Sequence, residues 1–296
     1  MLVIGSRGSQ LALWQSRWVQ ARLAELGVES SIRVIQTTGD RVQDVALSMV
    51  GTKGLFTKEI EEALLDGSAD LAVHSLKDMP TELPEGLILA AIPVREDPRD
   101  ALVGSTLAGL AEGARIGTSS LRRAAQLRHL RSDLDVQTIR GNVDTRLRKL
   151  DQGQFDAIVL ASAGLRRLGW ENRITEYLDP SVMCPAVGQG ALAIETRAEP
   201  SVASRLDHAA TRTQVTAERA LLAALGGGCQ VPVGAYAVLE PGDRLTLTGV
   251  VVAPDGSQVI RKSAQGLAGA AAELGRDLGE ALLAAGGRSI LESVYA

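Results

Sequence analysis

Short apolar runs alternate with helical patterns along the chain, and this alternation constrains the fold more than any other feature. The runs at residues 2–4, 69–73, 114–117 and 155–161 each indicate a short buried strand. Most are followed by a polar or glycine-containing turn and then by a helical pattern. Strands that alternate with helices predict an α/β fold with largely parallel sheets. Polar residues at the carboxyl ends of such strands are expected to face a ligand-binding crevice.

Composition excludes several functional classes. With 296 residues, of which 45% are hydrophobic and 22% charged, the chain is expected to form a soluble globular protein of two or three domains. A net charge of −4 and only 3% aromatic residues argue against nucleic-acid binding. No apolar run reaches membrane-spanning length, and we expect no signal peptide. Two cysteines make no disulfide framework, so a cytoplasmic location is expected.

Charged and glycine-rich breaks predict three domains. Residues 95–100 (REDPRD) are interpreted as a crossing into a second domain, and residues 184–190 (CPAVGQG) as the return. Two crossings predict two lobes on the plan of periplasmic-type binding proteins. After about residue 210, a helix, three strand-like runs and a final helix predict a small α+β domain. The predicted boundaries are 1–94 with 190–208 for domain 1, 95–189 for domain 2 and 209–296 for domain 3.

The polar end of the run at 69–73 is the strongest candidate for chemistry. His, Ser, Lys and Asp occur together within residues 74–78. Pro80 prevents a helical continuation and biases the residue before it toward an extended conformation. A carboxylate held there can accept a proton or stabilise a nearby cation, so Asp78 is the expected catalytic group. The alternative is a solvated turn with a local ion pair between Lys77 and Asp78.

A strand, a turn and a helix at the N-terminus form a second candidate. Arg7, Ser9 and Gln15 lie near the expected helix start, where anions are favoured. Simple capping by Ser9 beside an exposed arginine is the alternative. The apolar residues that recur at helical spacing, and so predict the buried face, are Leu11, Trp14, Trp18 and Ala21.

In the expected second domain, each of three successive strands is followed by residues that include hydroxyl side chains, glycine or arginine. After the first, Thr118 and Ser120 precede a helix with Arg122 and Arg123 in its opening turn. The helix dipole disfavours cations there, and a bound anion would resolve the conflict. We therefore expect Arg122 and Arg123 to bind an anion and to contribute little to the stability of the unliganded protein. The basic residues after the other two strands are Arg140, Arg146, Arg148, Lys149, Arg166 and Arg167.

Two glycine-flanked residues lie outside the regular pattern. Lys53 follows Gly-Thr and precedes glycine in an irregular stretch, which suggests a loop over a ligand; the spacing is not that of a phosphate-binding Walker loop. Cys229 follows three glycines, which predicts an accessible thiol, whereas Cys184 is followed by proline. A buried structural cysteine is the usual alternative. No metal site is predicted.

Eight stretches together resemble the hydroxymethylbilane synthase family, also called the porphobilinogen deaminase family. They occur in the family's order over nearly the whole chain. They are 9–15 (SQLALWQ), 54–56 (GLF), 73–80 (VHSLKDMP), 95–100 (REDPRD), 117–123 (GTSSLRR), 140–143 (RGNV), 185–190 (PAVGQG) and 227–232 (GGCQVP).

The resemblance implies a monomeric three-domain transferase of tetrapyrrole and heme biosynthesis. Such an enzyme joins four porphobilinogen molecules head to tail, releases ammonia at each step and hydrolyses off linear hydroxymethylbilane. The chain grows on a dipyrromethane cofactor attached by a thioether, and the family's attachment position matches Cys229. Since every pyrrole carries two carboxylates, the growing chain requires many fixed cations, and arginine binds carboxylates in a bidentate manner.

The resemblance also implies roles for individual residues, with Asp78 as the catalytic carboxylate. The implied cofactor-binding residues are Cys229, Lys53, Ser75, Lys77, Thr118, Ser120, Arg122, Arg123 and Arg146. The implied substrate-binding residues are Arg7, Ser9, Gln15, Arg140, Arg167 and Gln189. Met49 stands where some members carry a second lysine, so no role is transferred to it.

Two other functions fit parts of the pattern. A two-lobed anion-binding protein without catalysis would explain the arginines but not the glycine-flanked thiol. A cysteine hydrolase would use Cys229 with His74 or His208 as base, and no spacing in the sequence places either histidine beside that cysteine.

Overall fold

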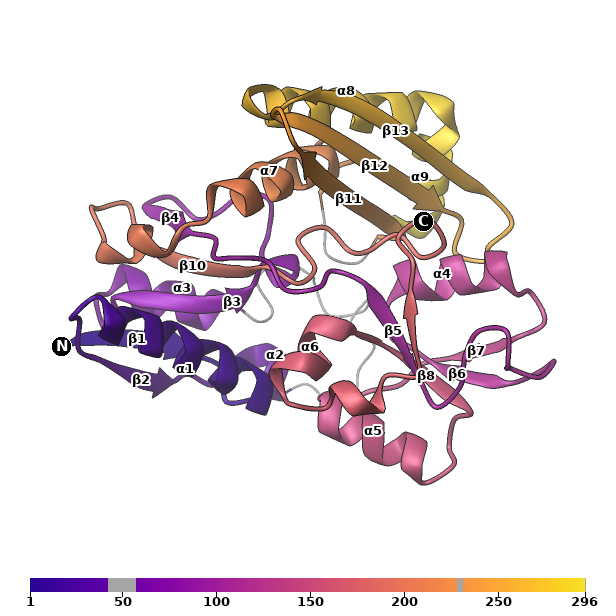
Figure 1. Cartoon of the computed structure of the whole chain (residues 1–296), viewed down its shortest axis with the longest axis horizontal. Coiled ribbons are helices and arrows are strands. Elements are labelled where there is room, and N and C mark those ends of the chain that lie inside the picture. The colour runs from indigo at the N-terminus through magenta and orange to yellow at the C-terminus, as the bar shows by residue number, and fades with distance from the viewer. Residues whose placement is uncertain (42–56, 228–230, 296) are drawn as a thin grey trace. The chain divides into compact units, whose positions relative to one another are not determined.

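A computed structural model describes residues 1–41, 57–227 and 231–295, and within these the chain forms two compact units (Figure 1). Unit 1 comprises Met1–Glu96 and Gly190–Arg212, and unit 2 comprises Asp97–Gln189 and Thr213–Ala296. The chain therefore passes from one unit to the other after Glu96, Gln189 and Arg212. The last passage lies within helix α7 (Ala209–Ala224).

Unit 1 is built on a mixed five-stranded sheet with the order β2-β1-β3-β10-β4. Strand β1 runs parallel to β2 and β3, whereas β10 is antiparallel to β3 and β4. The strands are β1 (Leu2–Ser6), β2 (Ser30–Val34), β3 (Leu71–Ser75), β4 (Leu87–Ala91) and β10 (Leu192–Arg197). The helical segments are α1 (Gln10–Glu25), α2 (Thr38–Arg41), α3 (Lys58–Leu65), and the 3-10 turns η2 (Leu76–Asp78) and η4 (Val202–Leu206).

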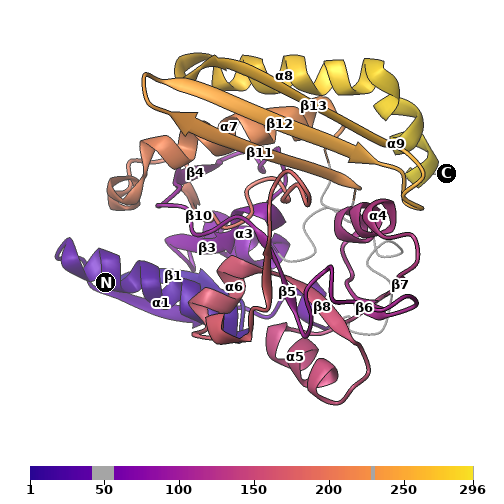
Figure 2. The ribbon, with the colours of Figure 1, turned by 45° about the vertical axis from the view of Figure 1, so that its right-hand side comes forward.

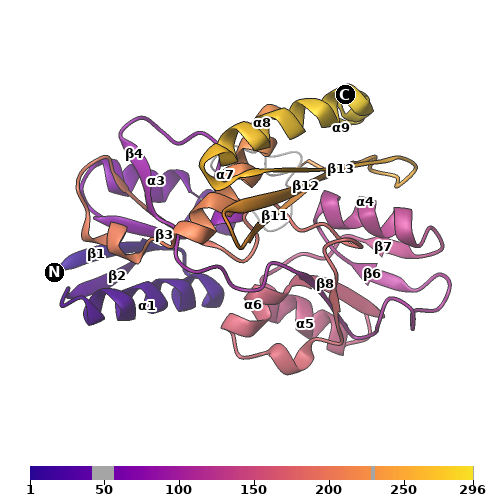
Figure 3. The same ribbon diagram turned by 45° about the horizontal axis from the view of Figure 1, so that its top comes forward.

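Helices cover both faces of this sheet, with α1 on one side and α3 on the other (Figure 3). Along β3, Leu71 and Val73 belong to the core that includes Val19 of α1. Ala72 points to the opposite face and joins the core that includes Ile60 of α3. The strand predicted at residues 69–73 is thus confirmed as a strand buried on both faces.

The predicted buried face of α1 is wrong. The residues that α1 buries are Ala12, Gln15, Ser16, Val19 and Leu23. Leu11, Trp14 and Trp18 are only partly buried, and Ala21 is exposed. A hydrogen bond explains part of the difference, because the Gln15 side chain donates to Ser75 Oγ of β3 (2.8 Å) and so turns a polar residue toward the sheet.

Unit 2 contains a second five-stranded sheet, with the order β7-β6-β8-β5-β9. Strand β6 runs parallel to β7 and β8, and β5 is antiparallel to β8 and β9. The strands are β5 (Asp100–Val103), β6 (Arg115–Gly117), β7 (Asp135–Gln137), β8 (Ala157–Ala161) and β9 (Glu176–Leu178). The helices are α4 (Leu121–Leu130), α5 (Val143–Asp151), α6 (Ser162–Arg167) and the 3-10 turn η3 (Glu171–Arg173). The sequence predicted neither β5 nor β9.

The C-terminal part of unit 2 is an antiparallel meander with helices against it (Figure 2). Its elements are β11 (Val233–Glu240), β12 (Arg244–Val252), β13 (Val259–Leu267), the 3-10 turn η5 (Ala268–Ala270), α8 (Ala271–Leu282), the π-turn η6 (Leu283–Gly287) and α9 (Arg288–Tyr295). Gly249 of β12 lets the helices approach, since a Cβ there would lie 2.7 Å from both Leu221 of α7 and Leu282 of α8.

The α/β class and the smaller C-terminal α+β region are confirmed by these three sheets. Unit 2 contains both the second sheet and the C-terminal meander, so the separate third domain stays a prediction. No helix in the described ranges is long and apolar enough to cross a membrane.

Candidate active site

The turn after β3 presents Asp78 on the surface of unit 1. Asp78 is exposed, whereas the nearby residues Leu76 and Met79 are only 1% and 2% exposed. Leu76 N–H donates to the carbonyl of Ala191 (3.0 Å), and Met79 N–H donates to that of Leu76 (3.1 Å). Met79 is extended, as predicted from Pro80. The turn is therefore anchored on both sides of an accessible carboxylate.

Ser75 and Lys77 are half-buried beside Asp78. Ser75 accepts the hydrogen bond from Gln15, so the predicted binding residue Gln15 supports this strand end from α1. Ser9 caps α1 by accepting from Ala12 N–H (3.2 Å), and Arg7 is half-buried in the preceding turn. Capping by Ser9 was the simpler alternative, and the structure contains it; anion binding by Arg7 and Ser9 stays a prediction.

The start of α4 in unit 2 carries two buried arginines. Ser120 is its N-cap and accepts from Arg123 N–H (3.4 Å), and Thr118 Oγ1 accepts from Ser120 N–H (3.2 Å). Arg122 and Arg123 are only 3% and 5% exposed. Burial of two cations within one helical turn requires an internal counter-charge or a bound anion.

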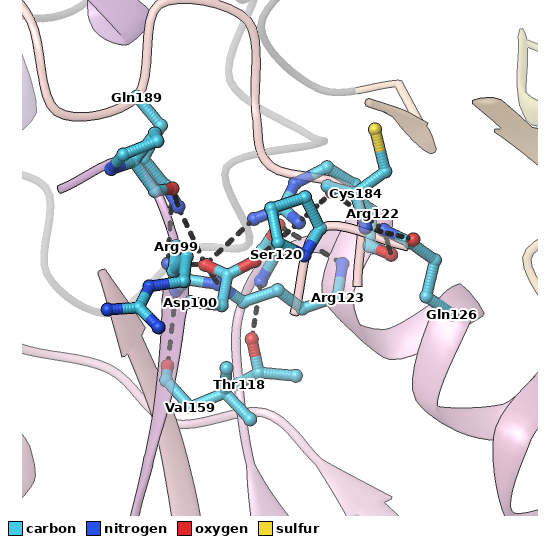
Figure 4. Close-up of polar contacts among 12 residues, drawn as sticks. Arg99, Asp100, Thr118, Ser120, Arg122, Arg123, Gln126, Val159, Cys184 and Gln189 are labelled. Carbon is cyan, nitrogen blue, oxygen red and sulfur yellow. Dashed lines mark hydrogen bonds and ion pairs between the residues drawn. The ribbon is translucent and has the colours of Figure 1, made fainter. Parts of the chain in front are cut away.

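Asp100, the first residue of β5, supplies the internal counter-charge (Figure 4). Its side chain is fully buried and accepts from Arg122 Nη1 (2.7 Å) and Arg123 Nε (2.9 Å). Burial by itself would raise the pKa of Asp100, but the two guanidinium charges and their hydrogen bonds hold it well below its usual range. A bound anion was expected to resolve the unfavourable charge at this helix start, and strand β5 brings a protein carboxylate to the same two guanidiniums. Ligand binding by Arg122 and Arg123 stays a prediction.

One carboxylate does not neutralise two guanidiniums, so the cluster keeps positive charge. Burial lowers the pKa of Arg123, and the neighbouring Arg122 lowers it further, against the opposing effect of Asp100. Arg122 Nε is buried without a hydrogen-bond partner in the described part of the chain. The remaining donor and charge suit an anionic ligand.

Arg146 of α5 extends the positive charge. Burial and the charges of Arg123 and Arg140 lower its pKa to about 10. Its Nε donates to the carbonyl of Gly141 (2.8 Å), and among the described residues no carboxylate pairs with it. A partly buried guanidinium near two others is unfavourable without an anion, which supports the predicted anion-binding role.

Gln189 belongs to the Asp100 cluster. It is fully buried, and its Nε2 donates to Asp100 Oδ1 (2.9 Å) and to the carbonyl of Pro98 (2.7 Å). Its Oε1 accepts from Arg123 Nη2 (3.4 Å). Gln189 thus braces the arginines from within the protein. Among the other predicted positions, Arg167 is buried in α6 and Arg140 is half-buried.

The structure brings Thr118, Ser120, Arg122, Arg123 and Gln189 into one cluster, and Asp100 is the member that sequence reasoning missed. A charged residue directly before the apolar run Ala-Leu-Val was the available signal. Lys53, Met49 and Cys229 lie outside the described residues.

Burial makes the thiol of Cys184 a poor nucleophile. Its side chain is buried, burial raises the pKa of its thiol to about 12, and the sulfur points away from the arginines (Figure 4). Its carbonyl accepts from Arg122 Nη1 (2.6 Å), so Cys184 contributes to the cluster through its backbone.

Neither histidine of the hydrolase alternative is arranged as a free base. His74 Nε2 lies 3.1 Å from the buried carboxylate of Glu195, and His208 Nδ1 contacts Thr211 Oγ1 (2.9 Å). Both rings thus have partners within unit 1.

Comparisons with known proteins point to one family over nearly the whole chain. Residues 2–205 match the family model described as porphobilinogen deaminase, dipyromethane cofactor binding domain, and residues 212–284 match porphobilinogen deaminase, C-terminal domain. Porphobilinogen deaminase from Syntrophobacter fumaroxidans is 52% identical over 301 residues, covering 99% of this chain and 97% of that protein. The protein of that name from Nitratidesulfovibrio vulgaris is 52% identical over 305 residues, covering 100% and 97%.

Among solved structures, a periplasmic substrate-binding protein of an ABC transporter from Coxiella burnetii is similar at a TM-score of 0.44 and 14% identity. The match covers 70% of this chain and 90% of that one.

Proposed function

The chain belongs to the porphobilinogen deaminase family, and from this premise we propose how its residues perform the reaction. The enzyme is a transferase that joins four porphobilinogen molecules head to tail, with loss of ammonia at each step. Growth occurs on a covalent dipyrromethane cofactor, and hydrolysis then releases the linear hydroxymethylbilane.

The observation that carries the residue assignment is the buried Asp100–Arg122–Arg123 cluster with its residual positive charge. Porphobilinogen and the cofactor both carry carboxylates. Guanidinium groups bind carboxylates through paired, directional hydrogen bonds, and a site shielded from water strengthens them. A cluster that stays cationic after internal pairing is suited to hold such ligands.

The residues present fit a dipyrromethane group. Within residues 1–41, 57–227 and 231–295, Arg122 Nε has no hydrogen-bond partner and Arg146 pairs with no carboxylate, so both are donors that a multiply anionic group would satisfy. Cys229 would hold the group covalently. When bound, the group supplies the pyrrole primer to which the first substrate is joined. The other proposed cofactor-binding residues are Lys53, Ser75, Lys77, Thr118, Ser120 and Arg123.

Asp78 is the proposed catalytic carboxylate. Departure of ammonia leaves positive charge on the substrate ring, and a pyrrole proton must later leave. An anchored carboxylate stabilises that charge and accepts that proton. The exposure of Asp78 and the burial of its neighbours Leu76 and Met79 support this assignment, since the carboxylate is accessible while its backbone is held.

Substrate carboxylates are proposed to bind Arg7, Arg140 and Arg167, with Ser9, Gln15 and Gln189 in support. The contacts of Gln15 with Ser75 and of Gln189 with Asp100 favour a supporting role for these two amides. We also propose that the protein is a cytoplasmic monomer and that residues 209–296 form a third domain. The antiparallel meander with its own apolar core supports the last point.

Intact-protein mass spectrometry tests the central assignment. Wild-type protein and Cys184→Ser should both carry the added mass of one dipyrromethane, whereas Cys229→Ser should lack it and be inactive. Added mass on Cys229→Ser but not on Cys184→Ser would refute the attachment site. Absence of turnover in loaded wild-type protein would instead favour an anion-binding protein without catalysis.

A further inference from the structure

Glu218 of α7 joins the return segment at residues 184–189 to strand β11 of the C-terminal sheet. Its side chain, on α7, is fully buried. One carboxylate oxygen, Oε2, accepts from Gly188 N–H (2.8 Å), and the other, Oε1, accepts from Ala237 N–H of β11 (2.9 Å). A buried carboxylate that accepts backbone hydrogen bonds from two separate segments fixes those segments relative to each other.

The backbone that Glu218 holds leads directly into the arginine cluster. Gly188 precedes Gln189, whose side chain contacts Asp100 and Arg123. Gly188 has a φ of +68°, a conformation that glycine adopts readily and that sets the direction of the following residue. The position of the Gln189 amide therefore depends on how Gly188 is held.

Apolar packing supports the same attachment. Val187 belongs to the core of the C-terminal region together with Leu221 of α7 and Val233 of β11. Val187 and Gly188 are thus bound to α7, while Gln189 reaches Asp100. A series of contacts therefore connects Glu218, through Gly188 and Gln189, to Asp100 and Arg123.

We propose that Glu218 is a positioning residue for carboxylate binding: through Gly188 and Gln189 it sets the orientation of the Arg123 guanidinium. The ligand part of this proposal rests on the proposed function. In this proposal Glu218 acts on the ligand indirectly, through the Gln189 side chain. Removal of that side chain must therefore abolish the influence of Glu218.

The test is a double-mutant cycle of Glu218→Gln and Gln189→Ala, each alone and combined. In Glu218→Gln an amide N–H₂ replaces one acceptor oxygen and faces a backbone N–H, so one of the two attachments is lost. We expect KM for porphobilinogen, measured on loaded enzyme, to rise about tenfold with a smaller change in kcat, as for a lost charge-assisted hydrogen bond. In the Gln189→Ala background the same change should alter KM less than twofold.

A second readout is independent of turnover. NMR follows the exchange of the Arg123 Nε–H proton with solvent, and the Arg123→Lys variant assigns its signal. The exchange should be faster in Glu218→Gln than in wild type. In the Gln189→Ala background, Glu218→Gln should cause no further acceleration. If the wild-type protein neither loads nor turns over, the proposed function fails, while this readout still decides the coupling. If the effects of Glu218→Gln and Gln189→Ala on the exchange rate are additive, the proposed positioning role of Glu218 is wrong.

Glu195→Gln is the matched control, since Glu195 is an equally buried carboxylate, but in unit 1, where it contacts His74. It should lower the melting temperature without altering Arg123 exchange. If it accelerates exchange as much as Glu218→Gln, the effect is general loosening and the proposal is overturned. If Glu218→Gln does not fold, Glu218→Asp keeps the charge, withdraws the carboxylate by one methylene and enters the same cycle.

Discussion

The two five-stranded sheets place different residues at equivalent positions. In unit 1 the last residue of β3, Ser75, pairs with Leu192 of the antiparallel strand β10. In unit 2 the last residue of β8, Ala161, pairs with Asp100 of the antiparallel strand β5. Both antiparallel strands closely follow a passage of the chain between the units. The same topology thus contains a buried leucine in one unit and a buried aspartate in the other.

The helix starts differ in the same way. Ser9 caps α1 and Ser120 caps α4, and each accepts from the third residue of its helix. In α1 that residue is Ala12, whereas in α4 it is Arg123. The cap is common to both units, but among the described residues the buried cations beside it belong to unit 2.

The difference shows that the fold does not require Asp100. Leu192 fills the equivalent position, 3% exposed and without charge. Buried ion clusters seldom stabilise a protein more than apolar residues of similar volume. Asp100 is therefore explained by the arginines that it pairs with, and the arginines by the carboxylates that we propose they bind.

The strand ends after β3 and β8 also contrast. In unit 1, one 3-10 turn exposes Asp78. In unit 2, α6 continues from β8 and buries Arg167. Unit 1 presents an accessible carboxylate, which is the proposed acid–base group, and unit 2 holds shielded cations.

Asp100→Leu should have the largest effect, since it places the leucine found at the equivalent position of unit 1, Leu192, in unit 2 without removing the arginines. Two buried guanidiniums then lack their carboxylate, and we expect the cofactor-free protein to lose about 3–5 kcal/mol of unfolding free energy. Chemical denaturation measures this. The control is Asp156→Leu, which removes the half-exposed partner of Arg115 and should cost far less, since exposed ion pairs contribute little. Equal losses in the two variants would show that the Asp100 cluster is no more than an ordinary ion pair.

Asp78→Asn tests the accessible carboxylate of unit 1. Loss of its charge should slow chain elongation by about 10²–10³, because a preorganised electrostatic group is removed. Stability should hardly change, since the side chain is exposed. Single-turnover elongation on loaded protein, followed by mass, gives the rate. Glu82→Gln, another exposed carboxylate of unit 1, is the control and should retain the wild-type rate.

The triple variant Asp100→Leu, Arg122→Leu and Arg123→Ala copies unit 1 completely at these positions. Replacing the whole cluster by apolar residues should recover most of the stability lost in Asp100→Leu, to within about 1–2 kcal/mol of wild type. Covalent cofactor should nevertheless be absent or scarce by intact mass. A triple variant that loads normally would show that the cluster serves the fold alone.

Arg146→Gln should have a small effect on stability and a clear effect on binding. The folded state lowers the pKa of Arg146 to about 10, so its charge opposes folding at neutral pH. The cofactor-free melting temperature should stay unchanged or rise slightly, while the loaded fraction falls. Arg115→Gln is the opposite control, because Asp156 raises the pKa of Arg115 and its loss should lower stability slightly.

The smallest expected effect is on acid stability. The pKa of Asp100 is lower in the folded state than the value of about 3.9 in an unfolded chain. Its stabilising contribution is therefore fully present above about pH 4 and is lost as the pH falls through the folded-state value. The difference in unfolding free energy between wild type and Asp100→Asn should narrow between about pH 4 and pH 2. A difference that stays constant over this interval would contradict the lowered pKa.

Local patterns in the sequence determined the features that depend on neighbouring residues. Apolar runs predicted β1, β3, β6 and β8, because burial on both faces leaves a continuous apolar stretch. Pro80 predicted the extended Met79, since the clash with its ring acts on the preceding residue alone. Eight ordered stretches predicted the family, and the comparisons confirm it.

Only the tertiary structure decided which distant groups meet. Asp100 lies 22 residues from Arg122 along the chain, and their contact depends on β5 joining the sheet beside β8. The buried face of α1 likewise depends in part on the hydrogen bond from Gln15 to Ser75, 60 residues away. The spacing of apolar residues along the sequence predicts which face of a helix or strand is apolar. A buried ion pair or amide contact depends instead on strand order and register. Strand order and register emerge only when the whole sheet has assembled, and they determine which arginines a protein carboxylate neutralises and which are left for the carboxylate binding that we propose.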